Sequence, residues 1–344
     1  MIGPVSGRIS GGIVACFGEV LLRFSPTGGG TMRDAGELAV HCGGAEANVA
    51  AALANLGHPA RMISALPDND LGRLALRSLR REGIDTAHIA TAPGRMGAYY
   101  LTPASGARQG AVLYDREGSA FANSADYDFA RALEGACHVH VSGISLAVSE
   151  VSASATMALA DGARDAGLTL SFDGNFRPAL WQDSNRNPRT VIAPLVERAD
   201  IFFGNHKDIA LLLGRDISGD GVERRREAAE AAFAAFPNLA AMASTARHVE
   251  ADGTHRIVGR MDTPEGSATS AERLLTGIVD RIGTGDAFAA GVLHRWLGDR
   301  EDLSGALESG MALAALKHFT PGDFSLASQD ELDAAMAGGG DVRR

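Results

Sequence analysis

Short β-rich runs alternate with alanine-rich stretches of helical periodicity through most of this chain. Such alternation is typical of parallel strands joined by crossover helices, and we expect an α/β fold in which helices cover a sheet. The expected strands include Ile13–Phe17, Arg61–Ala65, His138–Ser142, Thr169–Asp173 and Ile201–Gly204, and the expected helices include Ala45–Leu56, Leu71–Arg81, Val151–Ala166 and Asp286–Leu297.

Two stretches, Val20–Val40 and Gly97–Tyr114, interrupt this rhythm. Both look like strands separated by Gly, Pro and Ser turns, with no helix between them. They predict a small antiparallel flap that can close over a ligand.

Length and composition limit the class of protein. The chain has 344 residues, of which 45% are hydrophobic, so it can bury a large core. Its formal net charge of −10 argues against nucleic acid or an anionic membrane surface as the main partner. Cys16, Cys42 and Cys137 are scattered, which indicates neither a disulfide framework nor a zinc site. The start lacks a signal-peptide pattern and no apolar run reaches ~18 residues, so we expect a cytoplasmic protein.

Residues 279–291 run from a loop with two glycines directly into a helical stretch. Gly283 and Gly285 allow main-chain N–H groups to turn inward, and the first helical turn adds unpaired donors at a positive dipole end. The pattern predicts a site for a phosphoryl group, with the carboxylate of Asp286 beside it. Taken alone, the same string also fits a tight turn in which Asp286 caps the helix.

Several motifs together resemble the ribokinase-like (PfkB) sugar kinases, and the resemblance runs nearly from end to end. They are HCGGAEANVA at 41–50, GNHKD at 204–208 and the junction at 280–286. Three further segments, at 114–116, 172–181 and 317–324, resemble the 2-keto-3-deoxygluconate kinases within that family. The resemblance implies a three-layer α/β/α sandwich with a small β-sheet lid, and transfer of the ATP γ-phosphate to a sugar hydroxyl.

The resemblance also implies how the chain is divided. We expect a kinase domain at 12–330, a lid formed from about 20–43 and 95–117, and a C-terminal tail at 331–344. Strands of such a lid often have exposed apolar faces, so a homo-oligomer formed through the lid is also expected.

In a kinase of this family, Asp286 would accept the proton of the attacking hydroxyl. The amides of Gly283, Thr284 and Gly285 would face charge on the γ-phosphate. Because phosphoryl transfer passes through a loose transition state, the carboxylate mainly has to orient the hydroxyl and take its proton late. The role of Asp280 stays open between a further carboxylate at the sheet edge and a supporting group.

Substrate recognition is expected at residues from the lid and from the loops that surround it. Arg116 and Arg177 suit the carboxylate of a 2-keto-3-deoxy acid, because a guanidinium offers it planar, paired donors. Tyr99 is a lid candidate, although Tyr100 could equally be the residue that faces inward. The resemblance also implies substrate contacts at Gly44, Asn48, Tyr114 and Asp323.

For the nucleotide, Asn205 and Asp208 resemble an Asn-x-x-Glu element that organises magnesium and phosphate. The shorter carboxylate of Asp208 still suits a metal contact made through water. The family's glycine-rich nucleotide loop corresponds to residues 242–248, which contain no glycine. Thr245 and Asn175 are expected to contact ATP, and Arg247 could stack near the base.

These observations predict an ATP-dependent, Mg²⁺-requiring kinase that forms the 6-phosphate of 2-keto-3-deoxygluconate. A monovalent cation could assist. One alternative is a fructokinase or another neutral-sugar kinase, and a second is a non-catalytic sugar-binding protein on the same fold, suggested by the missing glycines. His138 and His140 are interpreted as strand histidines, and Arg224–Arg226 as part of an exposed helix face.

Overall fold

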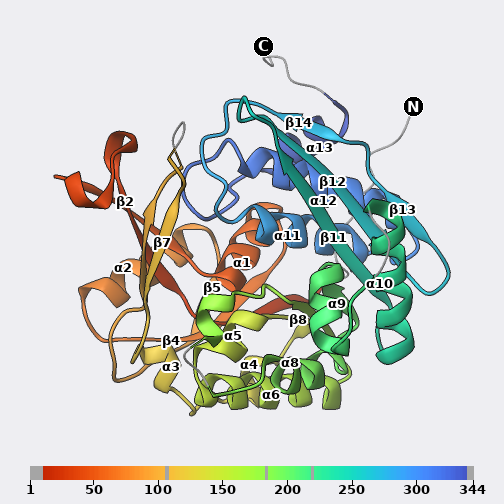
Figure 1. The fold of residues 1–344 in the computed structure, drawn as a ribbon. Coiled ribbons are helices and arrows are strands. Elements are labelled where there is room, and N and C mark those ends of the chain that lie inside the picture. Colours follow the sequence, from red (N-terminus) through yellow and green to blue (C-terminus); the bar gives the residue numbers. More distant parts are fainter. Residues whose placement is uncertain (1–10, 105–107, 183–184, 218–220, 339–344) are drawn as a thin grey trace.

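Within the described residues, which are 11–104, 108–182, 185–217 and 221–338, ten strands form a main sheet and four form a smaller one (Figure 1). These elements come from a computed structural model. In chain order they are β1 (Ile13–Phe17), β2 (Leu21–Pro26), β3 (Leu38–Gly43), α1 (Ala45–Asn55), β4 (Ala60–Leu66), α2 (Asp70–Arg81), β5 (Asp85–Thr91), β6 (Ala98–Thr102), β7 (Ala111–Asp115), α3 (Ala120–Asn123), α4 (Phe129–Ala132), β8 (Ala136–Ser142), α5 (Gly143–Val148), α6 (Glu150–Asp165), β9 (Thr169–Asp173), α7 (Pro178–Trp181), α8 (Pro188–Val196), β10 (Ile201–Phe203), α9 (His206–Leu213), α10 (Gly221–Ala235), β11 (Ala241–Val249), β12 (His255–Asp262), β13 (Ser267–Thr269), β14 (Arg273–Leu275), α11 (Thr284–Trp296), α12 (Leu303–Lys317) and α13 (Gln329–Met336).

The main sheet has the strand order β13-β12-β11-β10-β9-β8-β1-β4-β5, and β14 also pairs with β12. The strands from β5 to β11 are parallel, as the alternating sequence predicts. Beyond β11 the sheet continues in antiparallel fashion through β12, β13 and β14. The sequence analysis did not predict this extension.

Side chains of the central strands alternate between two cores, one on each face of the main sheet. In β1, Val14 and Cys16 join the core formed with α1, α2, α11 and α12. Ala15 and Phe17, from the same strand, join the core formed with α5, α6, α8, α9 and α10. Because successive strand residues point to opposite faces, a buried parallel strand must be apolar on both. The three-layer α/β/α prediction is confirmed.

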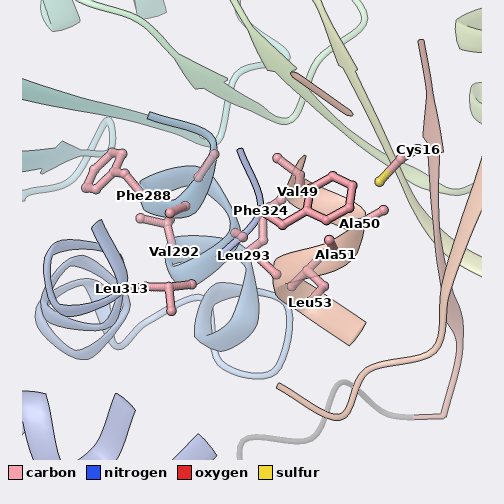
Figure 2. Packing of buried hydrophobic residues seen from close by; sticks show 14 of the residues in the cluster. Cys16, Val49, Ala50, Ala51, Leu53, Phe288, Val292, Leu293, Leu313 and Phe324 are labelled. Atoms are coloured by element: carbon pink, nitrogen blue, oxygen red, sulfur yellow. The ribbon is translucent and has the colours of Figure 1, made fainter. Parts of the chain in front are cut away.

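Helices α1 and α11 pack against each other on the first of these faces. Figure 2 shows apolar side chains of α1, among them Ala51 and Leu53, beside Leu293 of α11 and near Phe324. Alanine-rich surfaces let two helices approach closely. Since α1 begins next to Gly44 and α11 next to Gly283, this packing fixes the two helix N-termini relative to one another.

The smaller sheet is the predicted lid, with strand order β3-β2-β6-β7. Its strands fall inside the expected segments 20–43 and 95–117, but β2 pairs with β6 in parallel, so the flap is mixed rather than purely antiparallel. The lid exposes four large apolar side chains, which could pack against a second subunit. A homo-oligomer formed through the lid therefore stays a prediction. The four side chains are Leu38, Val40, Val112 and Leu113.

The C-terminal boundary differs from the prediction. Residues 329–336 form α13, which packs on α12 and buries Leu332 completely, so the predicted tail at 331–344 is wrong for its first part. Residues 339–344 of that tail lie outside the described part of the chain. No helix among the described residues is long and apolar enough to cross a membrane.

Candidate active site

A cleft of about 600 Å³ is lined by residues of the lid and by residues at the carboxyl ends of β9 and β10. Ligand sites of open α/β sheets lie at this edge. The structure brings every predicted site residue to this one cleft. They are Gly44, Asn48, Tyr99, Tyr114, Arg116, Asn175, Arg177, Asn205, Asp208, Thr245, Gly283, Thr284, Gly285, Asp286 and Asp323.

Gly283 is the N-cap of α11 and has a left-handed backbone, with φ of 80°. A Cβ on this residue would overlap the carbonyl oxygen of Asp323. The cap uses no side chain, so the interpretation of Asp286 as a helix cap is wrong. Among the described residues, nothing accepts a hydrogen bond from the amides of Gly285 and Asp286, which are therefore free to bind an anion.

Asp286, in the first turn of α11, is held by Asn48 in the first turn of α1. The side-chain amide of Asn48 donates to Oδ2 of Asp286 at 2.6 Å. Burial raises the pKa of Asp286 to about 7, although the Asn48 hydrogen bond and the charge of Arg177 act in the opposite direction. A carboxylate with a pKa near neutrality and a fixed orientation suits a general base.

Asp173 is a cleft residue that the sequence analysis missed. It ends β9, and its Oδ1 accepts a hydrogen bond from the amide of Asn175 at 2.9 Å. Burial and the charge of Asp286 raise the pKa of Asp173 to about 8. Its place at the carboxyl end of a predicted parallel strand was the signal that could have found it.

The loop after Asp173 contains a strained residue. Asn175 has φ of 37°, and it is the one non-glycine residue with positive φ in the described part of the chain. Backbone of this kind costs about 1–3 kcal/mol and is retained mainly at binding and catalytic sites. Its position in the cleft supports a role in ligand contact.

Asn205 and Asp208 form a capping box at the start of α9. The carbonyl oxygen of the Asn205 side chain accepts from the amide of Lys207 at 2.8 Å, and Oδ2 of Asp208 accepts from the amide of Asn205 at 2.7 Å. Burial raises the pKa of Asp208. One carboxylate oxygen is thus committed to the helix start.

The two arginines predicted to bind a carboxylate are in different environments. Arg116 is buried and ion-paired with Glu19, with Nε at 2.8 Å from Oε2. Arg177 is exposed in the cleft, and none of the ion pairs among the described residues involves it. Of the two predicted arginines, Arg116 is therefore neutralised by Glu19, a carboxylate that the sequence analysis did not consider, and Arg177 is not.

A buried network joins the lid to the loop before α11. Arg23 of β2 is ion-paired with Asp280 at 2.7 Å and lies 3.2 Å from Oδ1 of Asp323. Asp280 also accepts from the amides of Ile282, at 3.0 Å, and Gly322, at 3.1 Å. These contacts answer the open question about Asp280: it holds the loop in place. The sequence analysis missed Arg23.

Tyr99, rather than Tyr100, faces the cleft from β6. Its hydroxyl donates a hydrogen bond to Asp323, whereas Tyr100 stacks on Phe24 with ring centroids 5.4 Å apart. Neighbouring strand residues point to opposite faces, so only one of the pair could reach the ligand.

Segment 242–248, expected to be a nucleotide loop, is part of strand β11 and pairs along its length with β12. The expectation of a loop was wrong because a long hairpin occupies this position. Thr245 and Arg247 nevertheless line the cleft, together with Arg281. Burial and the charge of Arg281 lower the pKa of Arg247.

The strand histidines are satisfied by hydrogen bonds. His138 contacts Thr169 at 2.7 Å and Ser171 at 2.8 Å, and His140 contacts Ser171 at 2.7 Å. Their interpretation as structural residues is confirmed.

A family model for pfkB family carbohydrate kinases matches residues 13–249. The chain belongs to the PfkB family of carbohydrate kinases. A 2-dehydro-3-deoxygalactonokinase of Haloferax volcanii is 32% identical over 325 residues, covering 94% of this chain and 96% of the relative. A probable chloroplastic fructokinase-6 of Arabidopsis thaliana is 29% identical, covering 88% of this chain and 76% of that protein.

Solved structures agree with this assignment. The crystal structure of a 2-dehydro-3-deoxygluconokinase from Thermotoga maritima has a TM-score of 0.89 and 31% identity, and covers 95% of this chain and 98% of that chain. As a PfkB carbohydrate kinase the protein is an enzyme, which sets aside the non-catalytic alternative, and family membership supports ATP as the phosphoryl donor.

Proposed function

We propose that this PfkB kinase phosphorylates a 2-keto-3-deoxy sugar acid, with 2-keto-3-deoxygluconate as the first candidate and the 6-hydroxyl as the acceptor. The observation that carries the proposal is Arg177, an exposed guanidinium in the same cleft as Asp286, with no carboxylate paired to it among the described residues. An acid group on the substrate would supply the missing partner. Relatives named for 2-dehydro-3-deoxy sugar acids, at about 30% identity, point the same way.

Asp286 accepts the proton of the sugar hydroxyl as the hydroxyl oxygen bonds to the γ-phosphorus. The bond from that phosphorus to the bridging oxygen breaks, and ADP leaves with the electron pair. The amides of Gly283, Thr284 and Gly285, at the start of α11, donate to the oxygens of the transferring group, and the amide of Thr284 gives up its long hydrogen bond to the carbonyl oxygen of Arg281, at 3.4 Å, to do so. Asn48 keeps Asp286 oriented toward the hydroxyl.

Asp208 and Asp173 are the carboxylates that would hold Mg²⁺, Asp208 through water. No group of three or more His, Cys, Asp or Glu residues suited to a metal occurs among the described residues. That fits Mg²⁺, which commonly keeps several waters and takes one or two carboxylates together with substrate phosphates. When bound, the ion would neutralise phosphate charge, and Asn205, Thr245 and Asn175 would contact the nucleotide.

One observation favours a neutral sugar as the second candidate. The prediction of a sugar acid used two arginines, Arg116 and Arg177, to bind the substrate carboxylate. Glu19 neutralises Arg116, so only one of these two charges is left for that carboxylate. A fructokinase-like activity would match the relative from Arabidopsis thaliana.

A coupled ADP-release assay over a sugar panel separates the two candidates. The panel contains 2-keto-3-deoxygluconate, 2-keto-3-deoxygalactonate, fructose, ribose and adenosine. The proposal expects the highest kcat/KM for one of the two keto-deoxy acids. A higher kcat/KM for fructose or ribose would contradict it.

Arg177→Ala tests the carboxylate contact directly. A hydrogen bond to a charged group is worth about 1.5–3 kcal/mol, so kcat/KM for the sugar acid should fall roughly 10–100-fold, mostly through KM. The loss for fructose should be smaller, because fructose has no carboxylate and loses only the effect of Arg177 on the pKa of Asp286. Equal losses of kcat/KM for both sugars would show that Arg177 does not bind the carboxylate of the substrate.

Arg116→Ala is the matched comparison. Removing this arginine leaves Glu19 buried without its partner, so we expect a loss of about 3–5 kcal/mol in the free energy of unfolding. Arg177→Ala should leave that free energy nearly unchanged, since Arg177 is exposed. Denaturant titrations of the two variants measure the difference.

The pH dependence of kcat/KM reports the ionisation of Asp286. Because the raised pKa is about 7 and the ionised form is the base, kcat/KM should fall about tenfold per pH unit below pH 7 and level off above it. Asn48→Ala removes a hydrogen bond that lowers this pKa, so the acid limb should move to higher pH. An unchanged kcat/KM between pH 5 and pH 8 would contradict Asp286 as the base.

A further inference from the structure

Lys317, the last residue of α12, is fully buried and has no part in the chemistry proposed above. Its ammonium donates a hydrogen bond to the carbonyl oxygen of Thr320 at 2.8 Å. Burying an ammonium costs several kcal/mol unless nearby negative charge compensates it. The free-energy cost of burying the Lys317 ammonium indicates that its charge has a role in this part of the protein.

Lys317 lies directly behind the start of α11. Its Cε is 3.4 Å from the point where a Cβ would stand on Gly283. The same end of α12 is fastened to the loop before Gly283, because the carbonyl oxygen of His318 accepts from the amides of Val279, at 2.9 Å, and Asp280, at 3.1 Å. The end of α12 that carries the lysine is therefore joined directly to the loop before Gly283.

The compensating charges around Lys317 are active-site carboxylates. Burial lowers the pKa of Lys317, while Asp280, Asp323 and Asp286 act to raise it. Arg23, paired with Asp280 and close to Asp323, supplies the second positive charge of this cluster. The two cations and the carboxylates Asp280 and Asp323 balance one another, which leaves the amides at Gly283 next to a fixed ammonium.

We propose that Lys317 is a built-in cation of the phosphoryl-transfer site: a positioning residue that holds the loop at Gly283 from behind and supplies there the positive charge that a bound monovalent cation would otherwise supply. The inference rests on the proposed role of residues 283–286 but not on the identity of the sugar. The ammonium already donates to a carbonyl oxygen, that of Thr320, and it experiences the negative charge of Asp280, Asp323 and Asp286, which would otherwise attract a free cation to this position.

The first test measures kcat of the wild-type enzyme in K⁺, Na⁺ and NH₄⁺ chlorides, with tetramethylammonium chloride keeping the ionic strength constant. The sugar is whichever member of the panel gives the highest turnover, so an error in the proposed substrate does not affect the result. We expect kcat to vary by less than about twofold. A rise of about fivefold or more with K⁺ would overturn the inference, because the site would then recruit its cation from solution.

The second test replaces the charge. In Lys317→Gln the side chain keeps a donor for Thr320 but loses the ammonium, and we expect kcat to fall about 10–100-fold with little change in KM for the sugar. Adding NH₄⁺ or K⁺ should restore part of the lost kcat in this variant and not in the wild type. Lys317→Met, which loses both donor and charge, should show a lower kcat still.

Arg73→Met is the control, because it also removes one positive charge but lies on the surface in exposed ion pairs with Asp68 and Asp70. It should behave as the wild type in every salt. Wild-type kcat in Lys317→Gln, or a reduced kcat that no cation restores although thermal unfolding shows a folded enzyme, would overturn the inference. If the variants do not fold, the wild-type cation series decides the question.

Discussion

Asp286→Asn is expected to lower kcat by about 10²–10⁴-fold while sugar and ATP binding stay close to normal. The variant keeps the size of the side chain and can still accept the hydrogen bond from Asn48 through its carbonyl oxygen. What it loses is the proton acceptor. Single-turnover kinetics together with calorimetric binding separate these effects, and near-normal turnover would refute the assignment of Asp286 as the base.

The stability of this variant provides an internal control. The fold raises the pKa of Asp286 to about 7, so the ionised carboxylate is less favourable in the folded than in the unfolded chain, and the associated stability is lost as pH rises through 7. Asp286→Asn avoids that loss. At pH values above the folded-state pKa, its Tm should equal or exceed that of the wild type. A lower Tm would mean that the loss of turnover reflects damage to the fold.

Gly283→Ala is the second change with a large expected effect. A left-handed backbone costs an alanine about 1–2 kcal/mol, and the added Cβ overlaps the carbonyl oxygen of Asp323. The loop around Asp323 must therefore move, which adds strain of about 1–3 kcal/mol. We expect a total loss of roughly 3 kcal/mol in the free energy of unfolding, together with loss of most turnover.

Gly285→Ala is the matched control for stability. A Cβ at this position meets no atom within 4 Å, and Gly285 lacks the positive φ of Gly283. Its free energy of unfolding should stay within about 0.5 kcal/mol of the wild type. Equal destabilisation by the two alanines would contradict the close approach of Gly283 to Asp323. Chemical denaturation of both variants measures it.

Local patterns predicted much of the fold and the position of the site. The strand Thr169–Asp173 has its predicted bounds, and α11 begins only two residues before the predicted Asp286. Strand and helix periodicity are properties of neighbouring residues, so they can be read without knowing the fold. The tail at 331–344 and the loop at 242–248 were predicted incorrectly because packing on α12 and pairing with β12 decide those segments.

Local sequence patterns could not predict which charged side chains form ion pairs. Arg116 and Arg177 look alike in the sequence, yet Glu19 neutralises only one of them. Glu19 and Arg116 are 97 residues apart, and Arg23 and Asp280 are 257 apart. No local pattern carries information over such separations.

By itself, the sequence determined the alternation of strands and helices, the glycines that open α11, and the carboxylate that follows them, because each depends on residues close together in the chain. Only the tertiary structure decided which charges are neutralised, that Asp173 and Asp286 line the same cleft, and that Lys317 lies against Gly283. The physical reason is that burial and long-range packing set the electrostatic environment of a side chain, and both exist only once distant segments have come together.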